Sequence, residues 1–347
     1  MRFVAQAIAE LQSRPLEEVA VPPPPTSVVC LDCQRDSVVD LSIVIVNWNV
    51  CDLLRRCLRS IVASCKLQVA SEVIVVDSGS TDGSVEMLRR EFPWVQLIAN
   101  EENVGFIRGS NQGIRASRGR CVLLLNPDAE VVGDALDIMV DYMEGHPQVG
   151  ALGPQLRYPD GSIQSSRRRF PTLTTAFLES TILQQWFPHN RVLDCYYIND
   201  QPDDAVQEVD WVVGACILFR REAIEQVGLL DESAFMYSDE LDWCRRAKAA
   251  GWRVAYLPTA QVIHHEGKSS EQALAARHIH FQGAKIHYFR KHHGRWAGAI
   301  LRAFLLLTYV YQLLEEGGKW LVGHKRPLRM QRMQTYWQVL GSRLRTG

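Results

Sequence analysis

The sequence predicts an α/β fold in which a mostly parallel sheet is flanked by helices, with a helical C-terminal extension. Apolar strand-like runs alternate with helical patterns between residues 41 and 125, and this rhythm is typical of parallel strands joined by helical crossovers. Two of the runs end abruptly in acidic and small residues, around Asp77 and Asp128. From about residue 271 the hydrophobic pattern is helical to the end of the chain.

The first half of the sheet follows from short apolar runs bounded by turn residues. Each run is followed by a segment whose apolar residues have helical spacing. We therefore expect strands at 41–46, 72–76, 95–98 and 121–125, and helices at about 50–65, 83–91 and 105–117.

The second half is expected to complete the same domain as a mixed sheet. The pattern predicts strands near 209–213 and 216–219, a helix at about 239–250, and strands at 253–256 and 260–263. The catalytic domain is thus expected to span 38–270, between an N-terminal extension (1–37) and a helical, basic region (271–347). The extension contains four consecutive prolines and one short helical stretch, so we expect it to be mobile or loosely docked.

Composition indicates a globular protein with a buried core, since 47% of the 347 residues are apolar. The formal net charge of −1 conceals an asymmetry. From Lys285 onward the chain carries twelve Lys and Arg against two Glu, so the remainder is acidic. An acidic main domain without a recognisable nucleic-acid module argues against nucleic-acid binding.

The nine cysteines are scattered, several of them inside apolar runs, and no secretory signal precedes them. This pattern favours reduced thiols and a cytoplasmic location. Cys30 and Cys33 form a CxxC pair, but no second pair follows at zinc-finger spacing, so we do not expect a metal site there.

A C-terminal apolar helix is expected at about 296–314, too short and interrupted for a transmembrane span. The basic stretch His324–Arg329 and further arginines follow it. Such a helix either lies in a membrane interface, with its cations on anionic lipid, or packs on the domain. We expect peripheral contact with the cytoplasmic face of the inner membrane.

The two strand ends predict a nucleotide and metal site, because ligands bind at the carboxyl ends of strands in open α/β sheets. Asp77 is followed by a serine- and glycine-rich segment, including Gly79, that can expose N–H groups to a phosphate or a nucleobase. Asp82 is either a ligand or a helix-capping residue. Asn126-Pro-Asp128 follows the strand at 121–125, and its carboxylate suits a hard cation that shares ligands with substrate phosphates.

Further residue types that bind ligands or do chemistry follow along the chain. Two adjacent carboxylates, Asp239 and Glu240, precede a predicted helix and offer a general base, with Asp242 close behind. His264, beside His265, ends the last strand and offers a metal ligand or a phosphate contact. The basic segment 167–169 either binds phosphates or forms a solvated turn.

In their order along the chain, these pieces resemble the inverting family-2 glycosyltransferases, which have the Rossmann-like GT-A fold. Within that family they resemble the rhamnosyltransferase-like group of bacterial surface polysaccharide synthesis. The resemblance covers about residues 41–270 and implies that Asn47 and Asn49 belong to the nucleotide-sugar site and that Asp77 binds the nucleobase. The other residues expected at that site are Gly79, Asn103, Gly105, Phe106, Asn111, Asn126, Trp211 and Gly214.

The resemblance also implies the catalytic roles. Asp128 matches the last acid of the family's Asp-x-Asp metal motif, whose first acid is replaced here by Asn126. His264 matches the residue that binds the metal or the diphosphate, and Mg²⁺ or Mn²⁺ is the expected cofactor. The general base falls on Glu240, with Asp239 as its rival because the order of the family's Glu-Asp pair is reversed here. Asp242 is expected to orient the helix or bind the acceptor.

The implied activity is transfer of a sugar, with inversion, from a nucleotide-diphosphate donor to a hydroxyl of a glycan or polyprenyl-linked acceptor in cell-surface polysaccharide synthesis. dTDP-rhamnose is the favoured donor and UDP-linked sugars are the alternative. A nucleotidyltransferase would carry a glycine-rich signature with a basic residue near the first strand, which 41–49 lacks. A non-catalytic binding or scaffolding module would be expected to have lost Asp77, Asp128 or Glu240, and all three are present.

Overall fold

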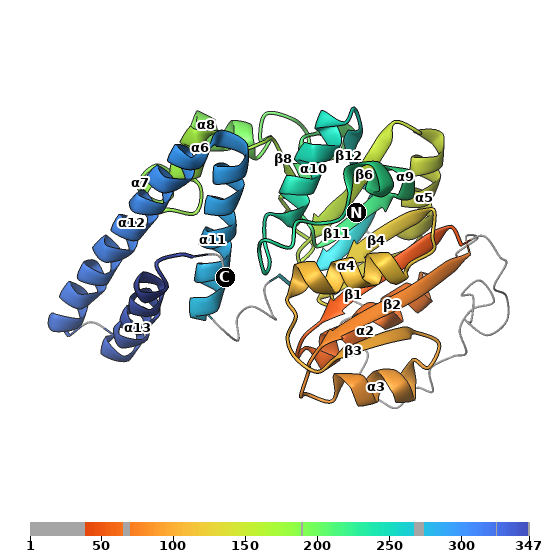
Figure 1. Ribbon diagram of the computed structural model, residues 1–347, viewed down its shortest axis with the longest axis horizontal. Helices are drawn as coiled ribbons and strands as arrows, with labels where there is room; N and C mark the ends of the chain where they lie inside the picture. The colour runs from red at the N-terminus through yellow and green to blue at the C-terminus, as the bar shows by residue number, and fades with distance from the viewer. Residues whose placement is uncertain (1–38, 65–69, 189, 267–273, 324, 346–347) are drawn as a thin grey trace. The chain divides into compact units, whose positions relative to one another are not determined.

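The computed structural model describes residues 39–64, 70–188, 190–266, 274–323 and 325–345 (Figure 1). These residues divide into two compact units. The first comprises the described chain up to Arg168, then Pro202–Leu230 and the described residues of Trp243–Ser269. The second comprises Arg169–Gln201, Asp231–Asp242 and the C-terminal helices. The predicted N-terminal extension, with its short helix and its CxxC pair, lies outside the described residues.

Within the described chain, ten strands of the first unit form one mixed sheet in the order β3-β2-β1-β4-β11-β6-β12-β5, with β7 beside β6 and β9 beside β12. The strands are β1 (Leu41–Asn47), β2 (Ser71–Ser78), β3 (Gln96–Asn100), β4 (Cys121–Leu125), β5 (Ala129–Val132), β6 (Val149–Arg157), β7 (Ile163–Gln164), β9 (Gln207–Val209), β11 (Cys216–Arg220) and β12 (Arg253–His264). β8 (Arg167–Arg168) and β10 (Trp211–Val212) form a separate antiparallel ribbon. The strands β3, β2, β1 and β4 are mutually parallel, whereas β11 runs antiparallel to β4 and β6.

Helices cover both faces of this sheet. They are α2 (Cys51–Ala63), α3 (Ser84–Glu91), α4 (Phe106–Ala116), α5 (Ala135–Gly145) and α9 (Arg221–Val227), while α10 (Asp239–Ala249) begins in the second unit and ends in the first. The odd-numbered residues of β1, such as Ile43 and Ile45, share one apolar core with Leu54 and Leu58 of α2. The even-numbered Val44 and Val46 face α4. This alternation is what the two-residue period of a strand requires when both of its faces are buried.

Two glycines one helical turn apart bring α4 close to β1. A Cβ at Gly109 would lie 2.9 Å from Val46 Cγ1, and one at Gly113 would lie 2.2 Å from Val44 Cγ1. Neither distance is compatible with a side chain, so the glycines set the distance between helix and sheet. The start of α4 is thereby fixed at the carboxyl edge of the strands.

The structure corrects three of the predicted segments. The strands expected at 253–256 and 260–263 are one strand, β12, with an irregularity between Leu257 and Gln261 that contains Pro258. The strand expected at 209–213 is two short strands, β9 and β10, which pair with different partners. The elements between 129 and 200 were not predicted, although α5 shows a regular helical spacing of Leu136, Met139, Val140 and Met143.

The second unit is helical. Its helices are α6 (Leu173–Leu178), α7 (Ile182–Trp186), α8 (Arg191–Tyr196), α11 (Leu274–His293), α12 (Arg295–Leu321) and α13 (Arg326–Ser342). The apolar helix expected at 296–314 is therefore longer than predicted, since α12 has 27 residues. Among the described helices, α12 is long and apolar enough to cross a membrane, by length and composition only. Only 28% of its most apolar window is buried, so this helix differs from an ordinary core helix.

We predict that Gly113→Ala destabilises the first unit by about 1–3 kcal/mol, because the added methyl group overlaps Val44 and forces α4 away from β1. Gly145→Ala, at an exposed helical position with no atom near the added Cβ, serves as the matched control and should change stability by less than about 0.5 kcal/mol. Urea unfolding followed by circular dichroism measures both. Equal stability of the two variants would contradict the close-approach role of Gly113.

Candidate active site

A buried hydrogen bond between an amide and a carboxylate joins the carboxyl ends of β1 and β2. The register places Asn47 beside Asp77, and both side chains are almost fully buried. Asn47 Nδ2 donates to Asp77 Oδ2 at 2.8 Å and to Ser80 Oγ at 3.1 Å. The backbone N–H of Ser80 donates to Asp77 Oδ1 at 2.8 Å. Each carboxylate oxygen of Asp77 thus accepts one of these hydrogen bonds and has capacity for a further donor, such as a nucleobase N–H.

The loop after β2 is held by Asn49 and by a close backbone approach. Asn49 has a left-handed conformation (φ 52°), its Oδ1 accepts from Thr81 N–H at 2.8 Å, and its own N–H donates to Ser80 Oγ at 2.9 Å. Gly79 has φ 70°, and a Cβ there would lie 2.9 Å from the carbonyl carbon of Glu102. Both residues therefore shape the loop around Asp77.

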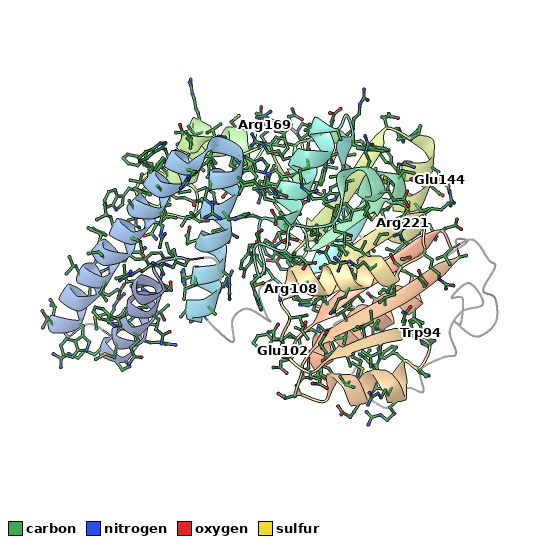
Figure 2. All side chains as sticks on the ribbon, viewed as in Figure 1. Trp94, Glu102, Arg108, Glu144, Arg169 and Arg221 are labelled. Carbon is green, nitrogen blue, oxygen red and sulfur yellow. The ribbon has the colours of Figure 1, made fainter. Side chains whose placement is uncertain are left out.

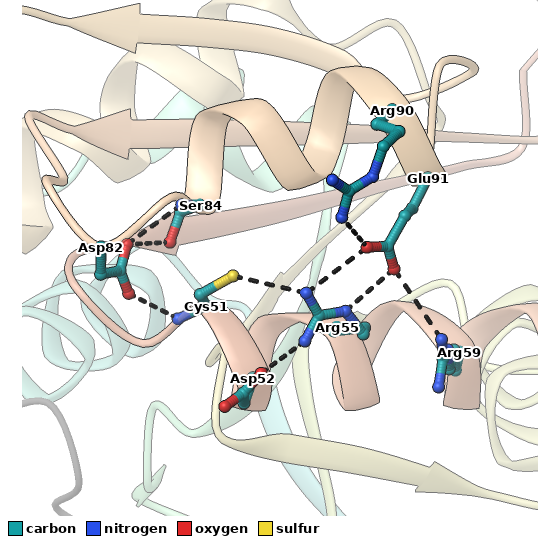
Figure 3. A network of polar contacts seen from close by, with 8 residues as sticks. All are labelled: Cys51, Asp52, Arg55, Arg59, Asp82, Ser84, Arg90 and Glu91. Atoms are coloured by element: carbon teal, nitrogen blue, oxygen red, sulfur yellow. Dashed lines mark hydrogen bonds and ion pairs between the residues drawn. The ribbon is translucent and has the colours of Figure 1, made fainter. Parts of the chain in front are cut away.

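Asp82 acts as a capping residue for two helices, one of the two roles the sequence left open. Its Oδ1 accepts from the N–H and hydroxyl of Ser84 in α3, and its Oδ2 accepts from the N–H of Cys51, the first residue of α2, at 2.7 Å (Figure 3). Figure 3 also shows Arg55 of α2 donating to Glu91 of α3, with Nε at 2.9 Å from Oε2. The starts of α2 and α3 are thus fixed side by side at this edge.

The segment before α4 contains residues with different roles. Asn103 Oδ1 accepts from the N–H of Gly105 at 3.0 Å, and Gly105 starts α4 with φ 83°. Phe106, the first residue of the helix, is partly exposed. Asn111, expected at the nucleotide-sugar site, is instead fully buried and exchanges two hydrogen bonds with the backbone of Leu230. These contacts give Asn111 a structural role, and its place at the nucleotide-sugar site stays a prediction.

Asp128 and His264 converge at the end of β4 because β5 reverses direction and pairs with the end of β12. Ala129 lies opposite His264, and Asp128 O accepts from the N–H of His265 at 2.9 Å. His264 Nε2 lies 3.3 Å from Asp128 Oδ1, and both side chains are buried. Despite this short distance Nε2 makes no hydrogen bond in the described structure.

The orientation of the His264 ring explains this arrangement. Its Nδ1 lies 3.0 Å from Gln164 Oε1, while Gln164 Nε2 donates to Glu266 Oε2 at 3.0 Å. The amide oxygen can only accept, so Nδ1 carries the proton. In the neutral ring Nε2 then presents a lone pair toward the carboxylate, an arrangement that a cation between them would stabilise. In metal sites, a residue that does not itself bind the metal commonly fixes the tautomer of a histidine ligand through a hydrogen bond.

The donor set fits a divalent cation that completes its shell with substrate. No three His, Cys, Asp or Glu side chains converge as a complete metal cage in the part of the chain that the structure describes. Mg²⁺ and Mn²⁺ sites in nucleotide enzymes commonly use one or two protein ligands and take the remainder from phosphates and water. One carboxylate and one imidazole nitrogen, as here, are sufficient for that arrangement.

The other residues expected near the metal or nucleotide lie as follows. His265 is paired with Glu130, Nε2 to Oε1 at 2.7 Å, so of the two histidines His264 is the one directed at Asp128. Asn126 is partly exposed in the turn that follows β4. Trp211 is buried in β10, and Gly214 is partly exposed before β11.

The arginines of segment 167–169 make contacts within the protein, and only Arg167 is buried, so at that position a solvated turn is not found. Arg167 is 4% exposed, and it donates to Gln207 Oε1 at 2.6 Å and to Pro202 O at 2.8 Å. Arg168 pairs with Trp211 in the β8–β10 ribbon. In the second unit Arg169, labelled in Figure 2, donates to Asp200 Oδ2 and Cys195 O, both at 3.0 Å.

The two candidates for the general base, Asp239 and Glu240, are the first residues of α10 and lie in the second unit. Tyr237 and Ser238, directly before it, both have left-handed backbones (φ 73° and 59°), each costing on the order of 1–3 kcal/mol. Burial raises the pKa of Asp239 well above its usual value, and the neighbouring Glu240 carboxylate raises it further. Asp239 therefore keeps its proton to higher pH than an ordinary aspartate, and its side chain shares a hydrogen bond with Glu240.

Asp242 is fixed by the C-terminal end of α11 within the same unit. His292 Nε2 and Lys291 Nζ lie 2.7 and 2.8 Å from its Oδ1. These contacts fit the helix-orienting role expected of Asp242.

Two residues that the sequence analysis missed position the others. Ser80 bonds to Asn47, Asn49 and Asp77, and Gln164 orients His264. Ser80 lies in the serine- and glycine-rich segment that was singled out, whereas nothing in the sequence around Gln164 indicates its contact with a residue 100 positions away.

Residues 42–228 match the model of the family described as Glycosyl transferase family 2. The chain is 31% identical over 272 residues to the N-acetylglucosaminyl-diphospho-decaprenol L-rhamnosyltransferase of Mycobacterium tuberculosis, covering 74% of this chain and 86% of that protein. It is 25% identical over 241 residues to a low-salt glycan biosynthesis hexosyltransferase of Haloferax volcanii, covering 67% and 69% of the two chains.

A solved structure shares the fold. The mannosyltransferase PcManGT from Pyrobaculum calidifontis, in complex with GDP-Man and Mn²⁺, superposes with a TM-score of 0.52 over 98% of this chain and 92% of that one, at 17% identity. This match confirms the predicted α/β architecture of the GT-A type.

We predict that Asp239→Asn stabilises the protein at pH 8 and leaves its stability unchanged near pH 3. A folded-state pKa above the unfolded value means that the stability associated with Asp239 is fully present below the unfolded pKa and is lost as pH rises through the folded pKa. Asparagine stays neutral and keeps a donor for Glu240. Thermal unfolding between pH 3 and 8 measures the difference.

Asp141→Asn, which removes an exposed carboxylate from α5, controls for the loss of one negative charge. A difference between Asp239→Asn and wild type that is independent of pH would contradict the assignment of a raised pKa to Asp239.

Proposed function

Because the chain belongs to glycosyl transferase family 2, we propose that it transfers a sugar, with inversion, from a nucleotide-diphosphate donor to a hydroxyl of a glycan or lipid-linked glycan. The observation that carries this proposal is the pair of Asp128 and His264, in which a buried Nε2 without a hydrogen bond is directed at a buried carboxylate. In a transferase that releases a nucleoside diphosphate, such a pair is suited to hold the cation that the leaving group requires.

Asp128 and His264 are the residues that would hold Mg²⁺ or Mn²⁺. The cation would stabilise the negative charge that develops on the departing diphosphate. The mannosyltransferase of similar fold was solved with Mn²⁺ and GDP-Man, which supports the same cofactor class here. Gln164 keeps the His264 lone pair available by accepting from the other ring nitrogen.

The nucleobase end of the donor is assigned to the edge formed by Asn47, Asn49 and Asp77. Asp77 can accept from a nucleobase N–H, while Asn47 and Ser80 hold its carboxylate in place. Asn47 Oδ1 is buried and has no hydrogen-bond partner in the described structure. A buried amide oxygen of this kind is stabilised when a ligand supplies a donor.

The general base is assigned to Glu240. Because Asp239 keeps its proton to higher pH than an ordinary aspartate, Glu240 is the member of the pair to which we assign uptake of the proton from an acceptor hydroxyl. The oxygen so released forms the new bond to the anomeric carbon as the bond to the diphosphate breaks, which inverts the configuration. The left-handed turn at Tyr237 and Ser238 holds the start of α10 in one conformation.

Rhamnose is the favoured sugar, carried by dTDP, with UDP-linked hexoses as the alternative. The relative that spans 74% of this chain is named as a rhamnosyltransferase acting on N-acetylglucosaminyl-diphospho-decaprenol, which also favours a polyprenyl-diphosphate-linked acceptor and a role in surface polysaccharide synthesis.

The exposed apolar face of α12 supports binding of the protein to a lipid surface. Large apolar side chains recur on it at helical spacing and are strongly exposed, at Trp296 (83%), Leu307 (68%), Leu314 (70%) and Leu321 (71%). The helix is about 40 Å long at 1.5 Å per residue. An apolar stripe of this length on a soluble surface marks a contact with another apolar phase.

We favour contact with anionic lipid at the cytoplasmic face of the inner membrane. Arg295 and Arg302 lie near one end of α12, and Lys325 and Arg326 follow its other end, so cations border the apolar stripe. The opposite face contains Glu316, which is 4% exposed and paired with Arg329 at 2.7 Å. Crossing the bilayer would expose this pair to hydrocarbon, so α12 is expected to lie in the interface.

We predict that the wild type releases nucleoside diphosphate from one of a panel of dTDP-, UDP- and GDP-sugars when a crude lipid acceptor is supplied. Glu240→Gln should lower this acceptor-dependent release about 10²- to 10⁴-fold, because it removes the general base. EDTA should abolish release, and Mg²⁺ or Mn²⁺ should restore it. Nucleotide release coupled to a colorimetric assay measures each.

Glu222→Gln, an exposed glutamate on α9, is the matched control and should keep wild-type activity. Full activity of Glu240→Gln with loss in Asp239→Asn would transfer the base role to Asp239. Absence of release from every donor, with the fold intact, would favour a non-catalytic nucleotide-sugar-binding module.

We predict that the full chain sediments with vesicles containing phosphatidylglycerol and that the double change Leu307→Glu, Leu314→Glu weakens this binding at least tenfold. Both changes place charge in the centre of the exposed stripe. Higher salt should also weaken binding, because the flanking cations are exposed. Leu173→Glu, at an exposed position of α6 in the same unit, is the control. Unchanged sedimentation, or a shift from dimer to monomer instead, would point to a second copy of the chain as the partner of this face.

A further inference from the structure

A cavity lies within the helical second unit. Its volume is about 400 Å³, and its walls come from α7, α11, α12 and α13 together with the turn before α7. This volume is within the usual range of small-molecule pockets, about 300–1,000 Å³. At about 30 Å³ per water molecule, it is far larger than the space needed for one structural water.

The wall of this cavity carries no formal charge and offers polar and apolar surface in similar amounts. Among the residues that line it, Leu305 is the only one with a purely apolar side chain, and none is Asp, Glu, Lys or Arg. A phosphate or carboxylate would find no cation there, and an acyl chain would strand the polar groups without partners. The wall therefore suits an uncharged ligand with many hydrogen-bonding groups.

Gln282 supplies an acceptor that is left open for such a ligand. Its side chain is 4% exposed, its Nε2 donates to Ser180 O at 3.5 Å, and its Oε1 has no hydrogen-bond partner in the described structure. A buried amide oxygen without a donor is unfavourable, and a ligand hydroxyl in the cavity would satisfy it.

Two aromatic side chains and an imidazole complete the wall. His278 Nδ1 lies 3.0 Å from the hydroxyl of Tyr309, and the Tyr309 and Tyr336 rings are 5.8 Å apart. Burial lowers the pKa of His278 and raises that of Tyr309, so both are neutral at physiological pH. Rings with a polar end offer an apolar face beside a hydroxyl, which matches a sugar, whose C–H groups and hydroxyls alternate around the ring.

We propose that this cavity binds a neutral sugar unit, and, resting on the proposed function, that this unit belongs to the acceptor glycan. The cavity would hold a sugar of the acceptor other than the one whose hydroxyl is glycosylated, since no carboxylate that could act as a base lines it. Its role would be to retain the acceptor and select its glycan.

The test is ligand-observed saturation-transfer NMR on the full chain, without donor, using methyl glycosides of rhamnose, N-acetylglucosamine, galactose and mannose. Inorganic phosphate and octanoate serve as anionic and apolar comparison ligands. We expect transfer to at least one glycoside. Gln282→Met, of similar shape but without the acceptor, should weaken its binding about tenfold. Gln312→Trp, at a partly exposed wall position, should fill the cavity and abolish binding.

Gln334→Met, at an exposed glutamine of α13, is the matched control and should bind as the wild type does. No transfer to any glycoside, or equal binding by wild type, Gln282→Met and Gln312→Trp, would overturn the proposal and leave the cavity to water. Acceptor-dependent nucleotide release by the wild type, with the crude lipid acceptor, is measured in parallel. Its presence keeps the glycosyltransferase proposal intact whatever the sugar result, and its absence would count against that proposal separately.

Discussion

The parallel register of β1 with β2 and β4 is the constraint on which the candidate active site depends. It places Asn47 beside Asp77 and brings the end of β4 to the same edge. A slip by one residue would turn every side chain to the opposite face, and would move Ile43 and Ile45 out of the core and against α4. The glycines of α4 admit only Val44 and Val46 on that side. Packing on both faces of β1 therefore fixes where the polar edge forms.

The acids of this sheet and its loops differ in the contacts that their carboxylates make. Asp82 uses its oxygens on the starts of α2 and α3. Glu72, buried in β2, accepts from Ser42 and from Arg118. Asp128 faces an imidazole nitrogen that carries a lone pair and makes no hydrogen bond. Burying a polar atom without a partner is costly unless a ligand compensates it, so the least satisfied contact of this edge is the one best explained by function.

Much of the fold was predictable because its signals are local. The alternating strands and helices from residue 41 to 125 depend on periodicity and turn residues, and the structure confirms them. The family and its fold were also correctly identified from the order of the strand-end motifs. Between 129 and 200, β6 and α5 are long enough to be predicted and were overlooked. The rest was not predictable, because strands β7 and β8 have two residues each and helices α6 to α8 have five or six. Such short elements show no full period.

The errors at the site have a common physical cause. Arg167 and Asn111 have the side chains expected of ligand-binding residues, and their contacts within the protein depend on burial and on partners far along the chain. Gln164 was missed for the same reason, since its effect on His264 depends on a contact that exists only in the folded chain. Sequence patterns identify which residues can bind a ligand. Whether a hydrogen-bond partner within the protein already occupies them depends on tertiary structure.

Helix α12 reverses the usual distribution of polarity on a surface helix. A globular surface helix buries its apolar stripe and exposes its charges, whereas α12 exposes Trp296, Leu307 and Leu314 and buries Glu316 and Thr308. The buried polar residues are satisfied locally or line the cavity, as Glu316 pairs with Arg329 and Thr308 lies in the cavity wall. The inward face thus has reason to be polar. The outward stripe has no such compensation within the described chain, and the membrane interface proposed for it would supply an apolar surface.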